Sequence, residues 1–170
     1  IMKLEMKAIK HAHFASQETY CYEGVVYIDG KKSLYVSNDG HGGSDHQDTV
    51  GDIPYSIIEK LDDWCKKNLP KWKVSFDGSD AEEQDTDFEM WCHNQVTQFL
   101  RRKELKRDLN KCVIFFKNGD LMESRYRVKK LSGVHMNHFK INHKNVKVIL
   151  NEMPFDDAFK IYNEFLERTA

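Results

Sequence analysis

The sequence predicts an α+β domain, with a mostly antiparallel sheet packed with about three helices. Stretches of alternating apolar and polar residues are grouped at the N-terminus and again after residue 110, and do not alternate regularly with helices. The dipeptides Asp29-Gly30 and Asn118-Gly119, which are typical of tight hairpin turns, lie between such stretches. A length of 170 residues fits one domain, which we expect over residues 2–170.

The N-terminal region predicts a three-stranded meander. Residues 3–11 alternate at period two, residues 20–29 are rich in Tyr, Val and Ile, and residues 34–36 follow the first tight turn. The next segment, residues 38–51, contains four glycines and almost no apolar residue. It therefore predicts a long polar loop, and such loops are often functional or mobile.

The rest of the chain predicts helices and a second group of strands. Helical spacing of apolar residues indicates helices at 54–69, 88–109 and from 153 onward. Period-two patterns indicate strands at 72–76, 112–116, 121–128 and 146–150. Residues 77–89 are acidic and predict a solvated loop, whereas residues 132–144 fit either a short helix or an irregular segment.

Charge is divided unequally along the chain. Residues 1–100 contain 10 basic and 18 acidic residues, and residues 101–170 contain 16 basic and 9 acidic residues, for a net charge of −1. The basic half can meet an anionic partner or the protein's own acidic half. We take its candidate basic surface to be Arg101, Arg102, Lys106, Arg125 and Arg127. Nucleic acid is a possible partner, although no nucleic-acid-binding motif supports it.

The composition favours the cytoplasm. The N-terminus lacks the apolar core of a secretion signal, and no apolar run is long enough to span a membrane. The chain has four cysteines without a CxxC motif, which we interpret as reduced, buried thiols. We therefore expect no membrane partner.

The glycine-rich loop is the first candidate site. Its glycines allow a close backbone approach, and consecutive N–H groups in such a loop can converge on an anion. The expected ligand is a phosphate-bearing small molecule, such as a nucleotide. The candidate ligand-binding residues are Asn38, Asp39, Gly40, His41, Gly42, Gly43 and Ser44. A flexible surface loop without a ligand is the alternative.

A divalent metal site is the second candidate. His11 and His13 are two residues apart on an expected strand and would share a face. Asp45 and His46 lie in the loop that follows the meander and could complete the ligand set. No metalloprotease, nucleophile-elbow or catalytic-cysteine signature is present, so the catalytic residues stay unassigned.

The first quarter of the chain resembles a group of small uncharacterised proteins of phages and bacteria. The resemblance rests on the run from His11 to Cys21, HAHFASQETYC, and on VSNDGHGG from Val36 to Gly43. It implies an accessory protein of a phage or mobile element, and hence the host cytoplasm. It implies no activity or catalytic residue.

Three functions remain open from the sequence. The first is a binding module for a phosphate-bearing small molecule at the glycine-rich loop. The second is a metal-dependent hydrolase that uses the strand histidines and the loop. The third is an interaction protein that blocks a host protein or binds nucleic acid through the basic surface.

Overall fold

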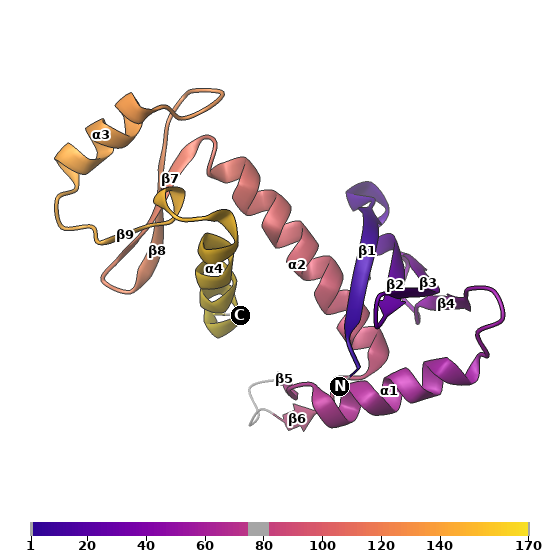
Figure 1. Ribbon diagram of the computed structural model, residues 1–170. Coiled ribbons are helices and arrows are strands. Elements are labelled where there is room, and N and C mark those ends of the chain that lie inside the picture. The colour runs from indigo at the N-terminus through magenta and orange to yellow at the C-terminus, as the bar shows by residue number, and fades with distance from the viewer. Residues whose placement is uncertain (1, 75–81, 170) are drawn as a thin grey trace. The chain divides into compact units, whose positions relative to one another are not determined.

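A computed structural model describes residues 2–74 and 82–169 and confirms the α+β class (Figure 1). Contacts between Cα atoms cluster into two compact units, residues 1–97 and 98–170. The sequence had predicted one domain over residues 2–170. Parts of the expected strand 72–76 and the expected acidic loop 77–89 lie outside the described residues.

The first unit contains a four-stranded antiparallel sheet. Its strands are β1 (Leu4–His11), β2 (Cys21–Ile28), β3 (Lys31–Asp39) and β4 (His46–Thr49), in the order β1-β2-β3-β4. The predicted meander is therefore confirmed and extended by β4, which lies inside the segment expected to be a loop. The sequence of β4 is His-Gln-Asp-Thr, so no apolar alternation marks it, and its pairing with β3 defines it.

One face of this sheet is buried. Tyr22, Val26, Leu34 and Val36 alternate with more exposed residues along β2 and β3 and form part of the core. Helix α2 (Phe88–Asp108) begins in this unit, and the rings of His93 and Tyr22 have centroids 6.0 Å apart. The beginning of α2 therefore lies against the same face of the sheet as Tyr22.

Four further elements of the first unit flank this sheet or connect its strands in the described part of the chain. Helix α1 (Ser56–Asn68) buries Leu61 and Cys65 and ends before Pro70, as its apolar spacing predicts. Strands β5 (Trp72–Val74) and β6 (Glu82–Gln84) pair as an antiparallel ladder. A 3₁₀ turn, η1 (His13–Ala15), follows β1.

The second unit contains the end of α2 and a three-stranded sheet. Its strands are β7 (Cys112–Lys117), β8 (Asp120–Arg125) and β9 (Val148–Ile149), in the order β8-β7-β9. The predicted hairpin is confirmed: Asn118 and Gly119 have positive φ angles of 55° and 92°, as a two-residue hairpin turn requires.

Two helices and a 3₁₀ turn, η2 (Leu150–Glu152), accompany this sheet. Helix α4 (Phe155–Thr169) buries Ala158 and Phe159 against Leu105, Cys112 and Leu150. Helix α3 (Gly133–Asn142) settles the open segment 132–144 as a helix, which buries only Phe139. Because a single buried residue makes no apolar stripe, the helical period was not visible in the sequence.

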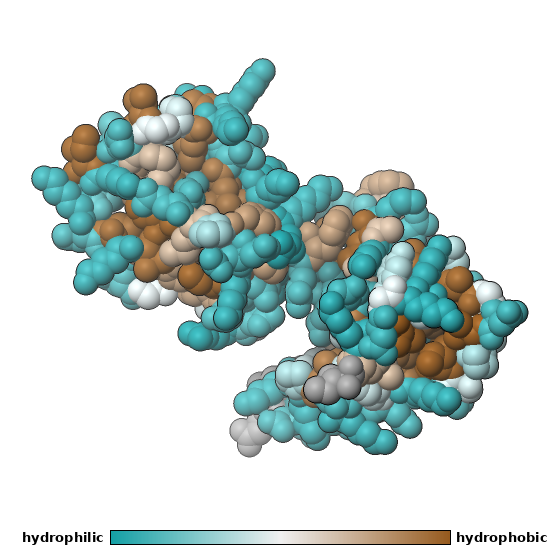
Figure 2. Space-filling model, viewed as in Figure 1, coloured by the Kyte–Doolittle hydropathy of each residue, from teal (hydrophilic) through white to brown (hydrophobic). Residues whose placement is uncertain are grey.

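No helix in the described part of the chain has the length and apolarity needed to cross a membrane. On the face drawn in Figure 2, hydrophilic residues cover most of the surface and apolar residues show between them. The four cysteines are unpaired thiols. Cys65, Cys92 and Cys112 are buried, as expected from the sequence, whereas Cys21 is only partly buried.

Candidate functional site

A carboxylate-histidine cluster lies where the loop before β4 meets the first two turns of α2. Oxygen atoms of Asp45 and Glu89 and a ring nitrogen of His93 all lie within 4.8 Å of one another. Glu89 and His93 are four residues apart on α2, so they project from the same face of the helix. The cluster therefore joins one loop residue with two residues of a single helix.

Asp45 is the centre of this cluster. Its side chain is 0% exposed, and its Oδ1 lies 3.2 Å from Nε2 of His93, which is 25% exposed. The hydroxyl of Tyr22 donates a short hydrogen bond to Oδ2 of Asp45. The backbone N–H of Asp45 donates to Oε1 of Glu89 over 3.2 Å. Donors thus approach both oxygens of a buried carboxylate, which a buried charge requires.

Asn38 connects the loop to this carboxylate. Its Nδ2 donates to Oδ1 of Asp45 and to the carbonyl oxygen of Gly43, both over 3.1 Å. Its Oδ1 accepts from the hydroxyl of Thr19 at 2.7 Å and from the N–H of Gly40 at 2.9 Å. The amide therefore fixes both the turn at Gly40 and the position of Asp45.

Gly40 is held by a segment that precedes β2. The N–H groups of Gln17, Glu18 and Thr19 converge on its carbonyl oxygen at 2.9, 3.0 and 3.4 Å. Gly40 has φ +87°, and a Cβ at this position would lie 2.1 Å from the carbonyl oxygen of Ala15. Only glycine satisfies both the positive φ and the close backbone approach. The segment before β2 therefore contacts the glycine-rich loop directly.

The electrostatics of the cluster favour a positive charge within it. Burial, and then the charge of Asp45, raise the pKa of the Glu89 carboxyl. The hydrogen bond to Asp45 raises the pKa of the His93 imidazole, against the effect of burial. Two carboxylates thus share a confined space that a cation would relieve.

The geometry of the cluster suits a metal ion. Two ligand atoms bound at about 2.1 Å to one ion are separated by roughly 3.0–3.4 Å in octahedral or tetrahedral sites. The 3.2 Å between Nε2 of His93 and Oδ1 of Asp45 agrees with this separation. Tyr22 and Asn38 would support the Asp45 ligand by hydrogen bonds, as partners of metal ligands commonly do.

The metal ligands expected from the sequence lie in several places. Asp45 belongs to the cluster, whereas His46 is exposed and forms a 2.9 Å pair with Asp48. Consecutive side chains of an extended segment point to opposite sides, which separates Asp45 from His46. His11 ends β1, with Nε2 at 3.1 Å from the hydroxyl of Ser16, and His13 lies in η1 beyond the strand.

Glu89 and His93 were missed by the sequence analysis. In residues 2–74 and 82–169, their group with Asp45 is the only set of three or more His, Cys, Asp or Glu with this ligand spacing. The separation of four residues on the clearest helix was a usable signal. It was hidden because both residues lie beside the apolar stripe and Asp45 is distant in sequence.

Several N–H groups of the loop expected to bind an anion donate hydrogen bonds to acceptors within the protein. Those of Gly40, His41 and Gly42 donate to Oδ1 of Asn38, Oδ1 of Asp39 and the hydroxyl of Thr19 at 2.9, 3.1 and 3.4 Å. Gly43 and Ser44 complete the predicted set, and the carbonyl oxygen of Gly43 accepts from Asn38. Acidic groups, including Glu18 beside Gly42, surround this loop. This arrangement suits a cation better than a bare phosphate.

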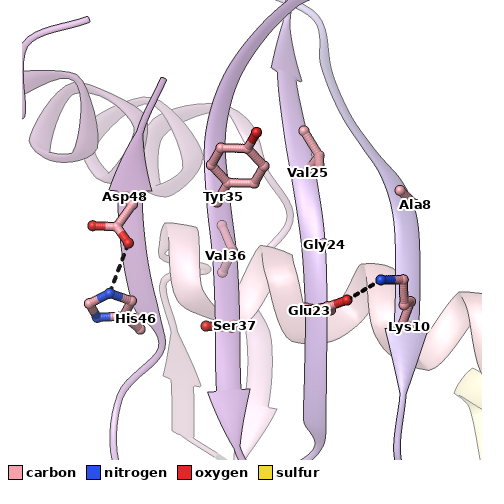
Figure 3. Close-up of a pocket in the computed structure, with 10 residues that line it drawn as sticks. All are labelled: Ala8, Lys10, Glu23, Gly24, Val25, Tyr35, Val36, Ser37, His46 and Asp48. Atoms are coloured by element: carbon pink, nitrogen blue, oxygen red, sulfur yellow. Dashed lines mark hydrogen bonds and ion pairs between the residues drawn. The ribbon is translucent and has the colours of Figure 1, made fainter. Parts of the chain in front are cut away.

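A separate hollow of about 260 Å³ lies on the open face of the four-stranded sheet (Figure 3). Ion pairs flank it on two sides, Lys10 with Glu23 and His46 with Asp48. Since each of these four side chains already has a polar partner, the hollow offers no unpaired group among them for a charged ligand. His46 therefore belongs to this surface and not to the buried cluster.

Most of the expected basic surface is paired with acceptors. Arg101 donates to Oδ1 of Asn163 over 2.8 Å, and Arg125 lies 3.4 Å from Glu123. Arg102 pairs with Asp156 and lies over the rings of Phe155 and Phe159. Lys106 and Arg127 form no ion pair within the described ranges. Arg101 and Arg102 therefore link α2 to α4, whereas the pair of Arg125 lies within β8.

Comparisons with known proteins add no relative: no family model, curated protein or solved structure matches this chain.

The loop geometry predicts unequal effects for two glycine substitutions. Gly40→Ala should lower the free energy of unfolding by more than about 2 kcal/mol, because it adds a backbone clash to the cost of a positive φ. Gly43→Ala, with φ +92° and nothing within 4 Å, should cost only about 1–2 kcal/mol. Urea unfolding measures both, and equal losses would contradict the close approach at Gly40.

The buried carboxylate predicts a similar contrast between two tyrosines. Tyr22→Phe should lower the free energy of unfolding by about 1.5–3 kcal/mol, because it removes a donor from the buried Asp45. Tyr55→Phe removes an exposed hydrogen bond of 3.2 Å to Asp48 and should change stability by less than about 0.5 kcal/mol. Thermal and urea unfolding test the pair; a Tyr22→Phe protein as stable as Tyr55→Phe would contradict this role.

Proposed function

We propose that the protein is a metal-dependent hydrolase that binds a divalent cation through Asp45, Glu89 and His93. The observation that carries the proposal is the convergence of two carboxylates and one imidazole within 4.8 Å. Nitrogen and oxygen donors of this kind suit Zn²⁺, Mn²⁺ or Fe²⁺. Three protein ligands also leave coordination positions for water and substrate, as catalytic sites require.

The substrate we propose is a phosphate-bearing small molecule. A divalent cation supplies Lewis acidity, by which it polarises a phosphoryl oxygen and lowers the pKa of a bound water. The acidic surroundings of the loop repel a free phosphate, so the cation is needed to attract it. Asn38 and Tyr22 hold Asp45 in place, and His93 is exposed enough to reach solvent.

The chemical environment of the nearby thiol argues for metal chemistry over a cysteine nucleophile. Cys92 is fully buried beside His93, and burial raises its pKa well above the ordinary value. A thiol held in the protonated form reacts poorly. The resemblance of the first quarter of the chain supports a role as an accessory protein of a phage or mobile element, and such a role is compatible with a small hydrolase.

Metal binding should depend on the three proposed ligands. We expect one Mn²⁺ or Zn²⁺ per chain by titration calorimetry and native mass spectrometry. Glu89→Gln and His93→Ala should each weaken binding more than about tenfold, because each removes one ligand. His46→Ala is the matched control, since His46 also pairs with a carboxylate, at 2.9 Å, but lies outside the cluster. Equal affinity in all three variants would refute the ligand set.

The hydrolase activity is tested with p-nitrophenyl phosphate and bis-p-nitrophenyl phosphate. Release of p-nitrophenol should require added metal and should be lost in His93→Ala but retained in His46→Ala. If the protein binds metal but hydrolyses neither ester, the cation site stands and the assignment as a hydrolase of these substrates is overturned.

Metal affinity should rise with pH. His93 and Glu89 both have pKa values raised above their ordinary values of 6.5 and 4.5, and both must lose a proton to act as ligands. Binding should therefore weaken as pH falls from about 8 to about 5, with proton release on binding at the lower pH. Calorimetry in buffers of different ionisation enthalpy measures the protons. An affinity independent of pH would contradict ligation by His93.

A further inference from the structure

A continuous stretch of the second unit contains no acidic residue. From Ser124 to Leu150 the chain has seven Lys or Arg and three His but no Asp or Glu. This stretch forms the end of β8, helix α3 and the segments on either side of the helix. The basic excess of the C-terminal half is therefore concentrated around one helix.

Most cations of this stretch have no acidic partner. Arg125 pairs with Glu123 and Lys140 with Glu152. The remaining five form no ion pair in the part of the chain that the structure describes, and all are exposed: Arg127, Lys129, Lys130, Lys144 and Lys147. Three of them precede α3 and two follow it. The helix is thus flanked by unpaired positive charge at both ends.

The outer face of α3 carries groups that can contact bases. Phe139 fixes the inner face, with its ring centroid 4.8 Å from that of Phe115 on β7. On the outside, Val134 is 76% exposed and Ile141 is 67% exposed. They are seven residues apart and so lie on one side of the helix, where Figure 2 shows exposed apolar residues over α3. The exposed Asn137 and His138 lie between them in sequence.

The N-terminus of α3 is capped by side chains. The N–H of Ser132 donates to Nδ1 of His135 over 3.1 Å, as part of a capping box. No acidic residue occupies the first turn, and a hollow of about 280 Å³ lined by Lys130 and Ser132 lies beside it. Room and positive charge are therefore present where a phosphate would approach.

We propose that α3 and its flanking lysines form a binding site for double-stranded DNA. Helix α3 has ten residues, and an α-helix with its side chains is about 10–12 Å across, which fits the major groove of about 12 Å width. Asn137 can pair with an adenine edge, while Val134 and Ile141 can contact thymine methyl groups. Lys129, Lys130 and Lys144 lie at both ends of the helix and would contact phosphates on the two sides of the groove.

Other partners fit this surface less well. A membrane-surface helix presents a broad apolar face, whereas Asn137 and His138 interrupt the outer side of α3. An acidic protein would match the positive charge. Charge matching alone, however, does not account for the exposed amide of Asn137 or the exposed β-branched side chains of Val134 and Ile141. The proposal concerns only the second unit and is independent of the metal site.

Fluorescence anisotropy with a labelled mixed-sequence DNA duplex tests the proposal. Binding should weaken steeply with salt, because phosphate contacts release counterions. The double variant Lys129→Gln/Lys130→Gln should bind more than about tenfold less tightly at fixed low salt, and should reduce the slope of log K against log salt by about 2. Ile141→Glu should also weaken binding, because it places an acid on the outer face of α3.

The matched control is Lys103→Gln/Lys160→Gln, which removes two exposed lysines from α2 and α4 in the same unit. Its affinity should fall less than about threefold. Circular dichroism melting confirms that the variants are folded, as expected for exposed positions. The proposal is overturned if DNA does not bind at low salt, if both double variants lose affinity equally, or if polyglutamate or anionic vesicles compete as tightly as DNA.

Discussion

The first unit is organised around the need to stabilise the buried carboxylate of Asp45. A charge with 0% side-chain exposure is costly unless hydrogen bonds or counter-charges compensate it. The compensation comes from Tyr22 on β2, Asn38 on β3 and His93 on α2. Two consecutive strands and one helix that is distant in sequence therefore converge on one side chain. Removal of any of these donors leaves the buried charge with fewer hydrogen bonds. Asn38 is itself held in place, because every hydrogen-bonding position of its amide is used.

The same constraint determines which ligand the site can accept. Glu89 approaches the N–H of Asp45, so a second carboxylate is confined next to the first. The loop supplies few unused N–H groups, because Gly40, His41 and Gly42 donate within the protein. The converging N–H groups that glycine-rich loops often offer to anions are supplied here by Gln17, Glu18 and Thr19, and they bind the carbonyl oxygen of Gly40. A cation satisfies these groups better than a phosphate does.

Local patterns made much of the fold predictable, while the site depended on tertiary contacts. Period-two alternation identified β1, and turn chemistry identified the hairpin at Asn118-Gly119. Strand β4 was not predicted because it carries no apolar residue. Helix α3 was left open because Val134 and Ile141 face outward and form no buried apolar stripe. Asp45 was among the residues expected to bind a metal, but the two residues that lie beside it, Glu89 and His93, are more than 40 residues away, and no spacing rule links them to it. Proximity created by packing is not encoded in a local pattern.

Paramagnetic broadening tests most directly whether a cation binds between Asp45, Glu89 and His93. Substoichiometric Mn²⁺, added to the isotopically labelled protein, broadens amide signals in NMR spectra according to their distance from the ion. Signals of Gly43, Ser44, Met90 and Cys92, which lie within two residues of the three ligands in sequence, should disappear first. Those of Ile28 and Lys31, which pair at the end of β2 and β3 away from Tyr22 and Asn38, should persist longest. Broadening centred on His13 or His46, or spread over the surface carboxylates, would contradict the account.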